Sequence, residues 1–121
     1  MNVFDSSALL AYLQSEVGAG AIRERLGDGG VCSAANWSEV AQKLLASEYS
    51  WPAARALLLG FGLAIEPVTM DDSELAARLW ESGSNLSLAD RLCLALGERL
   101  GADILTCDKQ WSGKSGVVLL R

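Results

Sequence analysis

Short apolar runs alternate along this chain with segments whose apolar residues recur at helical spacing. The apolar runs fall at 2–4, 29–33, 63–68, 102–106 and 117–120. The helical patterns begin with a segment directly after Asp5 and continue at 18–26, 37–46, 51–61, 72–81 and 88–100. In 37–46, for example, Trp37, Val40 and Leu44 share one helical face. The pattern therefore predicts strands and helices in alternation.

This alternation indicates the fold class. Short apolar strands separated by helices favour a parallel sheet covered by helices on both faces. We predict an α/β fold with three layers (α/β/α) and a mostly parallel central sheet of about five strands. No Pro- or Ser-rich linker and no repeat interrupts the pattern, so residues 1–121 are predicted to form a single domain.

Composition excludes several kinds of chemistry. The chain has no histidine, which rules out a Ser-His-Asp triad, a two-histidine ribonuclease and histidine-ligated zinc. Its cysteines are odd in number and lack CxxC spacing, so we expect no disulfide framework and a cytoplasmic location. The apolar run 56–65 is much shorter than the about 20 residues of a membrane span. We therefore expect no membrane segment.

Acidic residues remain as the source of reactivity. The net charge of -5 lacks the basic signature of a general nucleic-acid binder. Acid, base or metal-binding work must fall mostly to the 15 Asp and Glu residues. Oxygen ligands of this kind select hard cations such as Mg²⁺ or Mn²⁺.

Four carboxylates are predicted to meet at one edge of the sheet. In a parallel α/β fold, the carboxyl ends of strands and the amino ends of helices share the edge where ligands bind. Asp5 closes the first strand, and Glu39 is expected in the first turn of the helix after the second. Asp90 is expected in the first turn of the last long helix, and Asp108 lies just past the fourth strand. Carboxylates that converge in this way repel one another unless a cation or protons neutralise them.

Each acid also has a purely local interpretation. Asp5 could cap the following helix, and Asp108 could be an ordinary turn residue. The segments 36–39 (NWSE) and 87–90 (SLAD) are typical of capping boxes. A further acidic cluster at 71–74 (DDSE) is predicted to be exposed and to serve only in capping and solvation.

Four segments carry a family resemblance: 3–10 (VFDSSALL), 36–40 (NWSEV), 86–96 (LSLADRLCLAL) and 104–111 (ILTCDKQW). In order and spacing they resemble the PIN-domain nucleases, and a chain of this length is similar to the VapC-type toxins of toxin-antitoxin pairs. The resemblance implies a PIN-like fold and a Mg²⁺- or Mn²⁺-dependent endoribonuclease that cleaves RNA by a metal-activated water. It also implies a cognate antitoxin protein and a homodimer.

The resemblance assigns roles to individual residues. It places the acidic quartet, both catalytic and metal-binding, at Asp5, Glu39, Asp90 and Asp108. It places supporting hydroxyl groups at Ser7 and Thr106, whose local alternative is to satisfy backbone groups in a turn. Three basic residues near the acids are candidate RNA contacts, with charge balance on a solvated face as the alternative: Arg91, Lys109 and Lys114.

Other features leave alternatives open. The apolar residues between Leu44 and Phe61 exceed what one helix pair needs, so part of them could form a dimer or antitoxin groove. Trp111 is expected in the core, with stacking on an RNA base as the alternative. Two other functions remain: a receiver-like phosphoacceptor domain, although 66–69 (EPVT) offers no acceptor aspartate after the third strand, and a catalytically silent PIN-fold binding module.

Overall fold

The computed structural model describes residues 1–121 and contains a five-stranded parallel sheet in the order β3-β2-β1-β4-β5. The strands are β1 (Asn2–Phe4), β2 (Gly30–Ser33), β3 (Ala64–Glu66), β4 (Asp103–Thr106) and β5 (Val117–Leu119). The helices are α1 (Ser6–Leu13), α2 (Ala19–Gly27), α3 (Ala34–Leu45), α4 (Trp51–Gly60), α5 (Met70–Arg78) and α6 (Leu88–Leu100), with a short 3₁₀ helix η1 (Lys109–Trp111). The predicted fold class is confirmed, and every strand pair is parallel.

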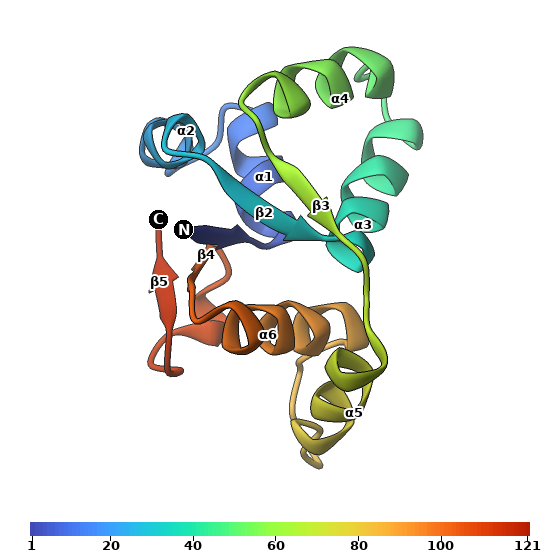
Figure 1. Cartoon of the computed structure of the whole chain (residues 1–121). Helices are drawn as coiled ribbons and strands as arrows, with labels where there is room; N and C mark the ends of the chain where they lie inside the picture. Colours follow the sequence, from blue (N-terminus) through green and yellow to red (C-terminus); the bar gives the residue numbers. More distant parts are fainter.

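Helices cover both faces of the sheet. In Figure 1, α1, α2 and α4 lie above the sheet, whereas α5 and α6 lie below it. Successive residues of a strand point to opposite faces, so each buried strand contributes side chains to two hydrophobic clusters. Phe4 packs with α1 to α4 in a cluster of 15 buried residues. Its neighbour Val3 packs with α6 and Trp111 in a second cluster of six. Trp111 is fully buried, which confirms the core interpretation of this residue.

The start of α3 differs from the prediction. The helix begins at Ala34, because Ser33 at the end of β2 caps it by accepting a hydrogen bond from the Ala35 amide at 3.2 Å. The expected capping box at 36–39 is therefore wrong. Glu39 is the sixth residue of α3 and lies in its second turn, not in its first. Asn36 lies inside the helix and is fully buried.

The acidic cluster at the start of α5 also differs from the prediction. Asp72 forms the expected capping box with Thr69, but the predicted exposure is wrong, because the residue is only 4% exposed. Burial acts to raise its pKa, and the hydrogen bonds from Arg99 and Thr69 outweigh this and lower the pKa. The Arg99 Nε group donates to Asp72 Oδ1 at 2.8 Å and ties α6 to α5.

Two expectations drawn from composition concern cysteines and membranes. Cys32, Cys93 and Cys107 are all free and buried. None of the helices combines the length and the hydropathy that crossing a bilayer requires.

Candidate functional site at the carboxyl edge of the sheet

The structure brings the four predicted acids to the carboxyl edge of the sheet. Asp5 follows β1 and Asp108 follows β4, while Glu39 and Asp90 project from the amino-terminal halves of α3 and α6. Their charges act on one another. The charge of Asp90 acts on Asp5, and the charges of Glu39 and Asp108 act on Asp90. Residues from four separate segments therefore share one electrostatic environment.

Asp5 is the most deeply buried of the four. It is 2% exposed and caps α1, as expected, by accepting a hydrogen bond from the Ala8 amide at 2.8 Å. Ser7 Oγ lies 2.8 and 2.9 Å from its two oxygens, and Thr106 Oγ1 donates to Oδ2 at 2.5 Å. Burial raises the pKa of Asp5 from 3.8 to about 6, although these hydrogen bonds act to lower it. The charge of Asp90 adds to the rise.

Ser7 and Thr106 combine both roles considered for them. Each hydroxyl donates toward Asp5 and accepts from the backbone after β4. The Cys107 amide donates to Ser7 Oγ at 3.0 Å, and the Asp108 amide donates to Thr106 Oγ1 at 3.0 Å. The two hydroxyl oxygens lie 3.1 Å apart. These residues therefore connect Asp5 with the backbone that carries Asp108.

Asp90 and Asp108 each use one oxygen in a local cap. Asp90 Oδ2 accepts from the Ser87 amide at 2.9 Å, and the expected capping box is present. Asp108 Oδ1 accepts from the Gln110 amide at 2.9 Å. Burial is the main cause of the raised pKa of Asp90. The hydrogen bonds with Ser87 oppose this rise, and the charges of Glu39 and Asp108 add to it. The other oxygen of each carboxylate receives no hydrogen bond from the protein.

Glu39 is held by two residues that sequence reasoning missed. Ser6 Oγ donates to Glu39 Oε1 at 2.9 Å, and Asn36 Nδ2 donates to the same oxygen at 3.1 Å. Asn36 Nδ2 also lies 3.5 Å from the carbonyl of Ala89, next to Asp90. The Oδ1 atom of Asn36 is buried and has no partner. Ser6 and Asn36 therefore link α1, α3 and α6 around Glu39.

Loss of the Ser6 hydroxyl should loosen Glu39. Partners that orient a functional carboxylate typically contribute 10- to 100-fold in metal affinity or activity. We expect Ser6→Ala to lower Mn²⁺ affinity, measured by calorimetry, by about tenfold. Ser6→Thr, which retains the hydroxyl, should keep most of that affinity. Equal Mn²⁺ affinities for the alanine and threonine variants would contradict the role of Ser6.

The three candidate RNA contacts lie in different surroundings. Arg91 Nη1 donates to the carbonyl of Ala76 in the last turn of α5 at 2.8 Å, so its guanidinium is used within the fold. Lys109 is exposed at the start of η1. Lys114 lines a cavity of about 650 Å³ beside α6. Contact of these residues with RNA stays a prediction.

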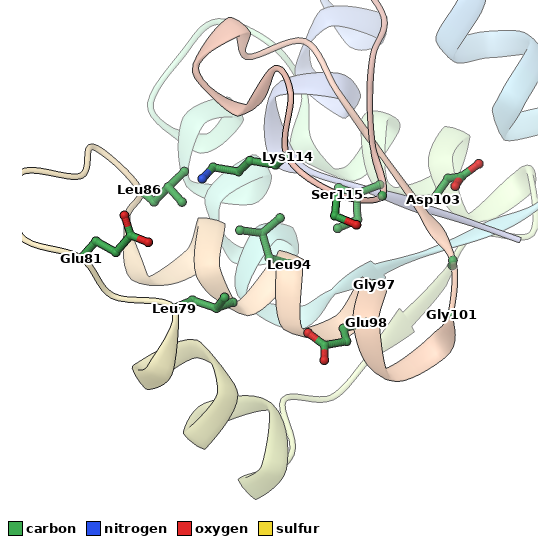
Figure 2. A pocket seen from close by; sticks show the side chains of 13 residues that line it. Leu79, Glu81, Leu86, Leu94, Gly97, Glu98, Gly101, Asp103, Lys114 and Ser115 are labelled. Carbon is green, nitrogen blue, oxygen red and sulfur yellow. The ribbon is translucent and has the colours of Figure 1, made fainter.

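That cavity is separate from the acidic edge. Figure 2 shows Leu94, Gly97 and Glu98 of α6 along it, with Lys114 and Ser115 on the opposite side. None of the four predicted acids lines it. The acidic edge is the candidate site because charges from four segments act on one another there, whereas none of these four acids lines the cavity beside α6.

The chemistry of the acidic edge fits a hard divalent cation. No three acidic or thiol groups are close enough to hold one ion together. Mg²⁺, however, usually keeps several waters and binds through one or two carboxylates. Glu39, Asp90 and Asp108 each present an oxygen that receives no protein hydrogen bond, and their mutual repulsion favours a cation between them.

Comparisons with known proteins identify the family. Residues 3–116 match the family model of the PIN domain, so the chain belongs to the PIN domain family. Two solved structures share its fold. One, a toxin-antitoxin complex from Klebsiella pneumoniae, has a TM-score of 0.77 at 19% identity and covers 100% of this chain and 98% of that chain. The other, the sarcin-ricin loop cleaving toxin VapC20 of Mycobacterium tuberculosis, has a TM-score of 0.72 at 20% identity and covers 93% of each chain. A search of the curated proteins found no match.

Proposed function

We propose that this chain is a metal-dependent endoribonuclease and the toxin of a toxin-antitoxin pair, acting as one domain over residues 1–121. The observation that carries the proposal is the convergence of four carboxylates at one sheet edge, where burial and neighbouring charges raise the pKa of Asp5 and Asp90. Membership of the PIN domain family supports it. The fold shared with a sarcin-ricin loop cleaving toxin supports an RNA substrate.

In this proposal Asp5, Glu39, Asp90 and Asp108 hold Mg²⁺ or Mn²⁺. When bound, the cation supplies a Lewis acid that stabilises negative charge on a phosphodiester and promotes loss of a proton from water. The protein residues orient the reactants. Ser7 and Thr106 fix both oxygens of Asp5, and Ser6 fixes one oxygen of Glu39. The Asp90 oxygen without a protein donor is available to orient a water and accept its proton.

A protein partner is the second part of the proposal. Of the apolar residues predicted for a dimer or antitoxin groove, Leu44 and Leu58 lie in the core. Leu45 at the end of α3, Tyr49 in the connection to α4 and Leu57 within α4 are 69%, 52% and 48% exposed. Exposed apolar groups on and between two consecutive helices favour a protein contact. We therefore propose an antitoxin or a second copy of the chain on this face, with the protein acting in the cytoplasm.

The two other functions fare differently. The receiver-like alternative is wrong, because the chain belongs to the PIN domain family. Glu66, the last residue of β3 and the first of the segment where an acceptor was expected, lies 3.8 Å from Arg99 in an ion pair. The catalytically silent binding module is separated from the enzyme by metal binding and by RNA cleavage, both of which it would lack.

Cleavage of RNA by the purified chain, freed of any partner, tests the proposal. A structured RNA is incubated with the protein in Mn²⁺ and, in parallel, in EDTA. We expect endonucleolytic fragments in Mn²⁺ and intact RNA in EDTA. Equal fragmentation in both conditions, or no fragmentation in either, would overturn the proposed function.

A further inference from the structure

A second cavity, of about 670 Å³, opens along α1 and starts at Ser7. Four of its lining residues, Ser7, Leu10, Ala11 and Gln14, follow one another at the spacing of a single helical face. The cavity therefore forms a groove that runs along α1 for about 10 Å, given the helical rise of 1.5 Å per residue. We call it the α1 groove.

The inner end of the α1 groove touches the acidic edge directly. Ser7, which lines the groove, donates through Oγ toward both oxygens of Asp5. Cys107, which also lines it, donates its amide to Ser7 Oγ at 3.0 Å. Lys43 on the groove wall lies four residues after Glu39, so both project from the same face of α3, about one helical turn apart. The α1 groove therefore adjoins the acidic edge through Ser7, although none of the four acids lines it.

The charge of the α1 groove differs from that of the protein as a whole. Lys43 and Arg121 line it, both are exposed, and neither forms a salt bridge. Glu16 is the single acidic side chain in the lining. A chain with a net charge of -5 thus presents two free cations beside its acidic edge. Cations in such a position attract phosphate groups.

We propose that the α1 groove guides the phosphate backbone of single-stranded RNA to the acidic edge, with Lys43 and Arg121 contacting phosphates. This inference rests on the proposed function and gives the acidic protein a means of holding RNA.

An apolar peptide is the less favoured occupant. Leu10 and Ala11 are only 8% and 4% exposed, so they offer little apolar surface to cover, and Val17 is the single widely exposed apolar residue in the lining. The basic residues of the groove are not those that the sequence predicted as RNA contacts. Of the predicted residues, Arg91 is bound to α5 and Lys114 lines the cavity beside α6.

The salt dependence of RNA binding tests the inference. All proteins carry Asp5→Asn to prevent cleavage, and binding of a fluorescein-labelled single-stranded RNA is followed by anisotropy over a range of KCl concentrations. Each phosphate contact contributes a slope of about 0.7 to log K against log salt for a single strand. The double substitution of Lys43→Gln and Arg121→Gln should therefore reduce the slope by about 1.4. Arg55→Gln, an exposed cation on α4 outside the groove, is the matched control and should leave it unchanged.

Glu16→Gln should have the opposite effect on RNA binding. Loss of the only acidic side chain in the groove should tighten RNA binding, whereas Glu48→Gln, at an exposed site outside the groove, should not. An unchanged slope in the double variant, or an equal fall in Arg55→Gln, would overturn the inference. If the double variant lost binding to a protein partner while its RNA slope stayed unchanged, the inference would also be overturned. Cleavage is measured separately with Asp5 intact, so failure of the groove is distinguishable from failure of the proposed function.

Discussion

Substitution of Asp90 by asparagine should lower kcat/KM for RNA cleavage by about 10³-fold while the fold stays intact. Asparagine has almost the same shape and can still accept the hydrogen bond that Asp90 Oδ2 receives from the Ser87 amide. The capping box is therefore largely preserved. The substitution removes the negative charge that neighbours Glu39 and Asp108, and with it the attraction for a divalent cation. Initial rates in Mn²⁺ over a range of RNA concentrations measure the effect.

Asp71→Asn is the matched control for Asp90→Asn. Asp71 also lies in the first turn of a helix, but it is exposed on α5 and is not part of the acidic edge. Its substitution should leave kcat/KM within about twofold of wild type, because exposed substitutions away from special features have small effects. Activity retained by Asp90→Asn, or a similar loss in Asp71→Asn, would contradict the assignment of Asp90.

Asp5→Asn should make the protein more stable above neutral pH although it removes activity. The folded pKa of about 6 lies above the ordinary value of 3.8, because burial disfavours the charged form. Folding therefore favours protonated Asp5, whose stabilising effect is complete below pH 3.8 and is lost as the pH rises through about 6. Each pKa unit corresponds to about 1.4 kcal/mol. The asparagine variant should gain about 3 kcal/mol in the free energy of unfolding at about pH 8.

Urea unfolding in EDTA measures this difference at two pH values. At about pH 4 the two proteins should differ by less than about 1 kcal/mol, since Asp5 is then protonated in the folded state. Asparagine can still accept the Ala8 amide hydrogen bond that caps α1. A variant that is less stable than wild type at the higher pH would show that the Asp5 carboxylate stabilises the fold, contrary to the burial argument.

The features that sequence predicted well are those set by neighbouring residues. The alternation of strands and helices was confirmed because each element carries its own apolar pattern. The caps at Asp5 and Ser87 were confirmed because a cap and the amide it binds are three residues apart. The capping box expected at 36–39 failed because β2 passes into α3 without a loop, which leaves Ser33 as the first residue able to cap.

Features that depend on distant partners could not be predicted in the same way. The exposure of Asp72 depends on Arg99, which lies 27 residues away. Ser6 and Glu39 are separated by 33 residues, and no local pattern joins them. Arg91 follows Asp90 directly, yet it binds the end of α5, because α5 packs against the outer side of α6. Lys43 could have been predicted as a candidate RNA contact, since it lies one helical turn from Glu39 on the same face.

Calorimetric titration with Mn²⁺ tests most directly whether the acidic edge is a cation site. The titration compares wild type with Asp90→Asn and with the control Asp71→Asn, all free of RNA and of any protein partner. We expect saturable binding to wild type and to Asp71→Asn, and a large loss of affinity in Asp90→Asn. Absence of binding to the wild-type protein, or equal affinity in all three, would show that the four carboxylates do not form a metal centre.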